Sequence, residues 1–84
     1  MDMPKYINYS EGILVAGLAR NCENSIHRDV LKINKALANF TNISWLVIES
    51  DSEDSTLNSL KDLQRKVQGF DFYTFGRLQG KLPL

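Results

Sequence analysis

The sequence lacks the features of disulfide-stapled, thiolate-metal, membrane-spanning and secreted proteins. Of its 84 residues only Cys22 is a cysteine, so neither an intrachain disulfide nor a thiolate metal cage can form. No apolar run is long enough to cross a bilayer, and residues 1–9 contain no signal-peptide core. These absences predict a cytoplasmic protein without a transmembrane segment, and the length allows one small domain.

An excess of charge of one sign is also missing. Ten basic and ten acidic residues cancel, and the hydrophobic fraction of 43% is ordinary for a globular protein. A neutral chain has no strong nonspecific attraction to nucleic acid or to an anionic membrane, so neither is an expected partner. The sequence has no internal repeat, no low-complexity segment and no glycine-rich phosphate loop.

What the chain does contain is an alternation of apolar runs and helical patterns. In chain order the predicted elements are a strand at 13–18, a helix at 25–39, a strand at 44–48, a helix at 54–68 and a strand at 70–75. We interpret residues 1–84 as a single domain. Within it, residues 1–12 are expected to be a lead-in and residues 77–84 an irregular tail.

The order of these elements predicts an α/β fold of the β-α-β-α-β type, a Rossmann-like half in three layers with two helices. Its parallel three-stranded sheet should have the spatial order third, second, first. The very apolar strand at 13–18 then lies at an edge. Because exposed apolar edges are normally paired or covered, we expect association through this strand, as a homodimer or with a missing C-terminal portion.

The predicted middle strand leads directly into a cluster of acids and hydroxyls. Four of the six residues from Glu49 to Asp54 are acidic, and ligands of open α/β sheets bind beyond the carboxyl ends of the strands. Asp54 and Ser55 are also good helix N-cap residues, and for these two residues capping alone is as good an explanation as a binding role. Capping does not account for Glu49 and Asp51, whose carboxylates suit a base, a ribose or a divalent cation.

Two segments together resemble a known family. Residues 14–21 read LVAGLARN and residues 46–56 read LVIESDSEDST, with a predicted helix between them. This is similar to the start of a GT-A-fold glycosyltransferase, and above all to the mannosyltransferases related to capsule-associated proteins. Their pattern is a strand, A-R-N, a helix and then E-N-D-S-x-D-x-T. The resemblance covers residues 13–75, and the sequence departs from it at Ser50, where the family usually has asparagine.

The resemblance implies that the two loops hold the nucleotide of a UDP- or GDP-linked sugar. By position, the nucleotide-binding residues would be Ala19, Arg20 and Asn21 around the nucleoside, Glu49 and Asp51 at the base and ribose, and Ser52 in the turn. The D-x-D motif that binds Mg²⁺ or Mn²⁺ in a full-length relative comes after the next helix and strand, so no cofactor is expected within this chain. We therefore expect the N-terminal donor-binding part of a glycosyltransferase, incomplete for catalysis by itself.

Two other functions stay open on the residues alone. One is a noncatalytic α/β module that self-associates through its first strand. The other is a small Mg²⁺-dependent phosphoryl-transfer or receiver-like domain using Asp51 and Glu49, although that class usually has a lysine where this chain has Arg77. Cys22 and His27 are close in sequence, but His27 lies beside the apolar stripe of its helix, which favours an exposed histidine over a nucleophile pair.

Overall fold

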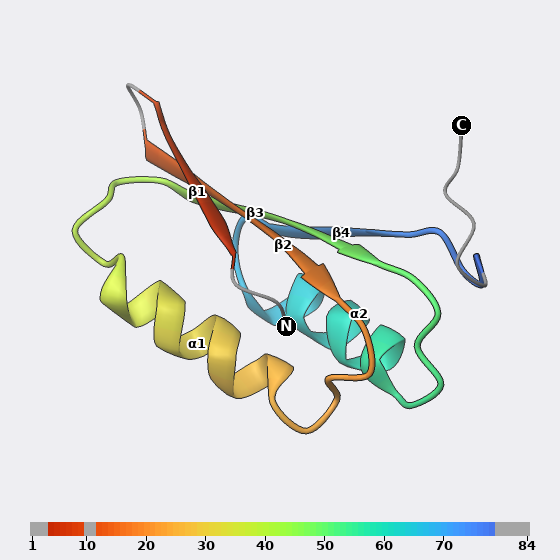
Figure 1. Ribbon diagram of the computed structural model, residues 1–84. Helices are drawn as coiled ribbons and strands as arrows, with labels where there is room; N and C mark the ends of the chain where they lie inside the picture. The colour runs from red at the N-terminus through yellow and green to blue at the C-terminus, as the bar shows by residue number, and fades with distance from the viewer. Residues whose placement is uncertain (1–3, 10–11, 79–84) are drawn as a thin grey trace.

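The computed structural model describes residues 4–9 and 12–78. Within these residues the elements are β1 (Lys5–Tyr9), β2 (Gly12–Ala19), α1 (Ile26–Ala36), β3 (Ile43–Glu49), α2 (Thr56–Lys66) and β4 (Phe70–Thr74) (Figure 1). The four strands form one sheet in the order β1-β2-β3-β4. Both helices lie on the same side of this sheet (Figure 1).

The predicted parallel three-stranded sheet is wrong, because the sheet has four strands and is mixed. The apolar runs do pair in parallel, with β3 between β2 and β4. The difference is β1, which pairs antiparallel with β2 from Lys5 opposite Ala16 to Tyr9 opposite Gly12. The segment expected to be only a lead-in therefore covers the apolar edge that the prediction left open. The part of the expected tail at 79–84 lies outside the described residues.

The predicted three layers are also wrong, and the reason is the direction in which the chain crosses the sheet. β2, β3 and β4 follow one another in a single direction. Right-handed crossovers that step in one direction place their helices on one face. The fold is therefore two layers, a sheet and a helical layer. Neither helix in the described residues is long and apolar enough to span a bilayer.

The core lies between the sheet and the helices. Its buried members are Val15, Ala19, Cys22, Ile26, Val30, Trp45, Val47, Leu60, Leu63 and Phe70. The apolar stripe predicted for the first helix is confirmed, because Ile26 and Val30 belong to this core and Ile33 and Leu37 pack against it. Along β2 and β3 every second residue points into this core, so the strands present one buried face to the helices.

Asp62 on α2 joins the two helices through an ion-pair cluster. Its carboxylate lies 2.9 Å from His27 Nε2 on α1, 2.8 Å from Arg65 Nη2 and 3.0 Å from Lys66 Nζ. The hydrogen bond with His27, and then that with Lys66, lower the pKa of Asp62 from 3.8 to about 2. The expected exposed histidine is found only in part, because the His27 side chain is 40% exposed and pairs with Asp62 on α2.

We predict that Asp62→Asn reduces the acid sensitivity of the fold. Because the folded-state pKa of Asp62 is below its ordinary value of 3.8, its carboxylate stabilises the fold above about pH 4. This contribution is lost as the pH falls through about 2. In thermal melts between about pH 5 and pH 2, the Tm of Asp62→Asn should therefore fall less than that of the wild type.

Asp29→Asn is the matched control for this experiment. It removes an acid that pairs, over 3.6 Å, with Arg28 of the same helix and not with a residue of α2. Its Tm should fall with pH as steeply as that of the wild type. Equal slopes for Asp62→Asn and the wild type would contradict the assignment.

Candidate functional site

The loops that follow β2 and β3 begin side by side at the carboxyl edge of the sheet. The two strands are parallel and in register up to Ala19, which lies opposite Glu49. From these residues the chain continues into the turn at Arg20 and Asn21 and into the acid loop, residues 49–54 (Figure 1). The fold thus brings together the segments singled out in the sequence, at the edge where open α/β sheets bind ligands.

Asn21 makes the first set of contacts between the loops. Its N–H donates to Ser52 Oγ over 3.1 Å, and its Oδ1 accepts from the N–H of Glu53 over 2.7 Å. Asn21 has a φ of 48° and Asp51 a φ of 57°, in the left-handed region that asparagine and aspartate adopt more readily than most residues. The backbone therefore turns sharply in each of the two loops, at the point where they meet.

Thr56, the first residue of α2, makes the second set of contacts. It is fully buried, and its Oγ1 accepts from the N–H of Cys22 over 2.8 Å and donates to Asp54 Oδ1 over 2.5 Å. Asp54 also accepts from the N–H groups of Thr56 (2.9 Å) and Glu23 (3.2 Å). The hydrogen bond from the Thr56 side chain lowers the pKa of Asp54. Asp54 thus supports the start of α2, whereas Ser55 makes no side-chain cap hydrogen bond.

Glu49 is directed into the protein at the base of the site. It is 3% exposed, its Oε2 accepts from the N–H of Ser52 over 3.1 Å, and its Oε1 accepts from the hydroxyl of Thr74 on β4. Both carboxylate oxygens therefore hold the surrounding chain in place. A carboxylate engaged in this way is a poor magnesium ligand, which argues against the receiver-like alternative.

Asp51 connects the acid loop to the segment after β4. Its N–H donates to the carbonyl of Gly76, and its Oδ1 accepts from the N–H of Leu78, both over 2.8 Å. The N–H of Phe75 donates to the carbonyl of Glu49 over 3.0 Å. Residues 75–78 therefore run beside the acid loop and form a third wall of the site.

A cavity of about 350 Å³ opens between these walls. The polar side chains that line it include Glu49, Asp51, Ser52, Asp54, Thr74 and Arg77. Of the predicted site residues, Ala19 is buried in the core and Arg20 is exposed at the turn. Asn21 does not line the cavity but donates a hydrogen bond to Ser52, which does. Sequence analysis gave Thr56 and Thr74 no role, since their contacts join residues that are 34 and 25 positions apart.

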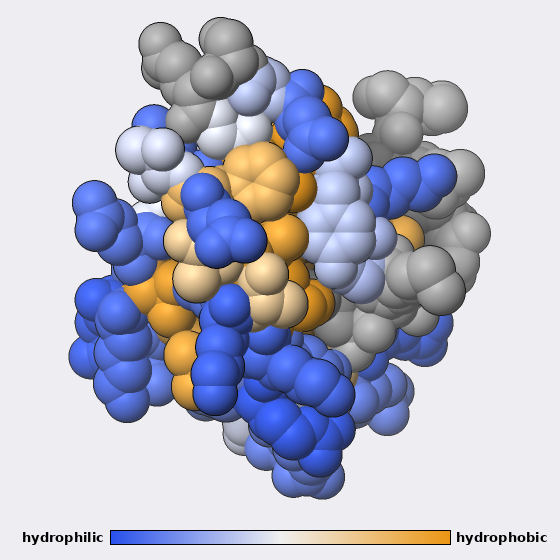
Figure 2. Space-filling view, turned by 90° about the vertical axis from the view of Figure 1, so that its left-hand side faces the viewer, coloured by the Kyte–Doolittle hydropathy of each residue, from blue (hydrophilic) through white to orange (hydrophobic). Residues whose placement is uncertain are grey.

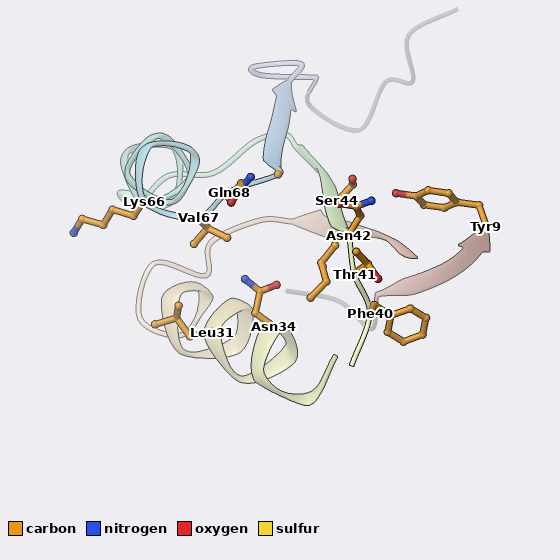
Figure 3. Close-up of a pocket in the computed structure, with 12 residues that line it drawn as sticks. Tyr9, Leu31, Asn34, Phe40, Thr41, Asn42, Ser44, Lys66, Val67 and Gln68 are labelled. Carbon is orange, nitrogen blue, oxygen red and sulfur yellow. The ribbon is translucent and has the colours of Figure 1, made fainter. Parts of the chain in front are cut away.

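A larger cavity, of about 560 Å³, lies at the opposite end of the sheet (Figure 3). It is formed where β3 begins and the helices end, and Figure 2 shows at this end of the molecule apolar side chains with hydrophilic ones to the left of them and below. Asn34 points into it, whereas Lys66 points away and pairs with Asp62 (Figure 3). Because ligands of such sheets bind at the carboxyl ends of the strands, the smaller cavity is the better candidate.

Comparison of the chain with protein-family models, curated proteins and solved structures finds no match. Among residues 4–9 and 12–78, no group of three or more histidine, cysteine, aspartate or glutamate side chains is arranged to hold a metal ion. The candidate site is therefore defined by its own geometry, as a polar cavity enclosed by two hydrogen-bonded loops and residues 75–78.

We predict that Thr56→Val loosens the junction of the loops. Valine keeps the shape of threonine but leaves the N–H of Cys22 without its acceptor in a buried position. The free energy of unfolding, measured with urea, should fall by about 1–3 kcal/mol. Thr56→Ser keeps the hydroxyl and should lose less, and Ser55→Ala should change little. A valine variant as stable as the wild type would contradict the role given to the Thr56 hydroxyl.

Proposed function

We propose that this chain binds the nucleoside diphosphate part of a UDP- or GDP-linked sugar at the carboxyl edge of its sheet. It would do so as the N-terminal donor-binding part of a glycosyltransferase, with no catalytic residue of its own. The observation that supports this most is the pair of hydrogen bonds between Asn21 and residues 52 and 53. They join the two segments that carry the family resemblance, beside a polar cavity.

The side chains of the cavity match the chemistry of a nucleotide. Carboxylates such as Asp51 accept hydrogen bonds from ribose hydroxyls and from the N–H groups of a base. Arg77 lines the same cavity, and a guanidinium group binds phosphate oxygens in a bidentate manner. Arg20, exposed at the neighbouring turn, adds a second cation at this edge. A volume of about 350 Å³ suits a small ligand of nucleoside size.

An NMR titration with UDP, GDP and their sugar conjugates, with and without Mn²⁺, tests the proposal. The amide resonances of Asn21, Asp51 and Ser52 should shift saturably. Those of Asn34 and Gln68, which line the cavity at the other end of the sheet, should stay unchanged. Shifts confined to that other cavity, or no saturable shift with any nucleotide, would refute the proposed site.

We predict that Asp51→Asn and Arg77→Gln weaken different parts of the interaction. Asparagine tolerates the backbone of position 51 and can still accept from the N–H of Leu78, so this variant removes the charge and keeps that hydrogen bond. This variant should bind nucleosides and nucleotides alike about tenfold more weakly. Arg77→Gln should weaken UDP or GDP binding by a similar factor and leave uridine or guanosine binding unchanged.

Lys61→Gln provides the control for both variants. Lys61 is exposed on α2 and does not line the cavity, so its loss should leave nucleotide affinity at the wild-type value. Calorimetric titration of all three variants measures the effect. Wild-type affinity in Asp51→Asn and Arg77→Gln would contradict the roles given to these side chains.

A further inference from the structure

The face of the sheet that carries no helix is rich in apolar side chains. Ile7 on β1, Leu18 on β2, Leu46 on β3 and Tyr73 on β4 are 53%, 57%, 40% and 61% exposed. The strand register places Leu18 beside Ile48 and Ile48 beside Tyr73, so these side chains adjoin across the strands. They form one patch, which we call the open face.

The composition of the strands is that of a sheet covered on both sides. A sheet with one solvated face normally alternates apolar and polar residues along each strand, whereas continuous apolar runs are typical of strands buried on both faces. β2 reads GILVAGLA and the centre of β3 reads WLVI, without alternation. Within the described residues the helices cover one face (Figure 1). The second apolar face thus has the composition of a buried surface.

The open face has the size of an interface. With about 200 Å² for each fully exposed large side chain, the exposed fractions of Ile7, Leu18, Leu46 and Tyr73 leave roughly 400 Å² of apolar surface. A standard interface buries about 800 Å² on each partner, of which somewhat more than half is apolar. The patch therefore supplies the apolar area that one side of a stable dimer needs.

One row of residues across the sheet indicates how a second copy fits. The register places Lys5 beside Ala16, Ala16 beside Leu46 and Leu46 beside Asp71. The row therefore has a cation at one edge, an acid at the other and apolar residues between them. At the β4 edge Asp71 Oδ1 accepts from Gln64 Nε2 of α2 over 2.8 Å and from the N–H of Phe72 over 2.9 Å, so Oδ2 is the oxygen that can face a second copy.

We propose that two copies of this chain pack face to face through their open faces, about a twofold axis parallel to the strands. This operation reverses the row, so that Lys5 of each copy faces Asp71 of the other and the small Ala16 faces the larger Leu46. A twofold axis across the strands would instead bring Lys5 against Lys5. Aligned packing of two sheets, about 10 Å apart, is the ordinary geometry of such layers.

Sedimentation equilibrium tests the dimer. The mass of the 84-residue chain should rise with concentration from 9.6 kDa toward twice that value. Leu46→Lys places a charge at the centre of the interface and should remain monomeric. Leu31→Lys makes the same change at a 56% exposed position on α1 and should dimerise like the wild type. A wild-type chain that stays monomeric, or a folded Leu46→Lys variant that dimerises fully, would overturn the proposal.

A charge reversal tests the orientation even if Leu46→Lys fails to fold. Lys5→Glu and Asp71→Lys each break both symmetric ion pairs, so each should raise the dissociation constant roughly threefold to thirtyfold. The double variant should recover the wild-type value, and no recovery would overturn the twofold arrangement. In a mixed-label sample, nuclear Overhauser contacts between the methyl groups of Ala16 and Leu46 of different copies are expected. Intermolecular contacts confined to β1 would show edge-to-edge pairing instead and refute the proposal.

Discussion

The parallel register of β2 and β3 is the constraint on which the rest of the structure depends. It ends both strands at the same level, so that the loops after them start side by side. A slip of one residue would turn every side chain of β3 to the other face of the sheet. That slip would expose Trp45 and Val47, which fill the core, and bury Leu46. The hydrogen bond from Trp45 Nε1 to Asn34 Oδ1, of 2.7 Å, also holds the register.

A structural role for the acids of the candidate site does not exclude a binding role. Burying a carboxylate is costly unless hydrogen bonds compensate, and Glu49 obtains these from Ser52 and from Thr74. Those bonds tie β4 and the acid loop to the end of β3. Asp54 likewise joins the start of α2 to the turn after β2. A carboxylate that orders the loops also fixes the shape of the cavity, so the same bonds that stabilise the fold prepare the site.

The sequence predicted those parts of the structure that rest on local patterns. The apolar runs and the apolar stripe of α1 indicate which segments pair and which face is buried. The parallel order of the strands then indicates that the loops after β2 and β3 meet at the carboxyl edge of the sheet. β1 carries no such pattern, because all five of its residues are exposed and its strand conformation depends on pairing with β2. Thr56 matches the last position of the family pattern, but its contact cannot be read from that pattern, since its partner Cys22 is brought to it only by the tertiary fold. The two-layer arrangement, in contrast, follows from the strand order and the handedness of the crossovers, and needs no further information.

The geometry of the open face also bears on the carboxyl edge of the sheet. A twofold axis parallel to the strands leaves the direction of the strands unchanged, so in the proposed dimer both carboxyl edges face the same end of the assembly. The two candidate sites would then lie on one surface, separated by the thickness of two packed sheets. The interface covers the open face, whereas the cavity opens at the strand ends beside Asp51 and Arg77. The two proposals, self-association and nucleotide binding, therefore concern different surfaces, and the experiments that test them are independent.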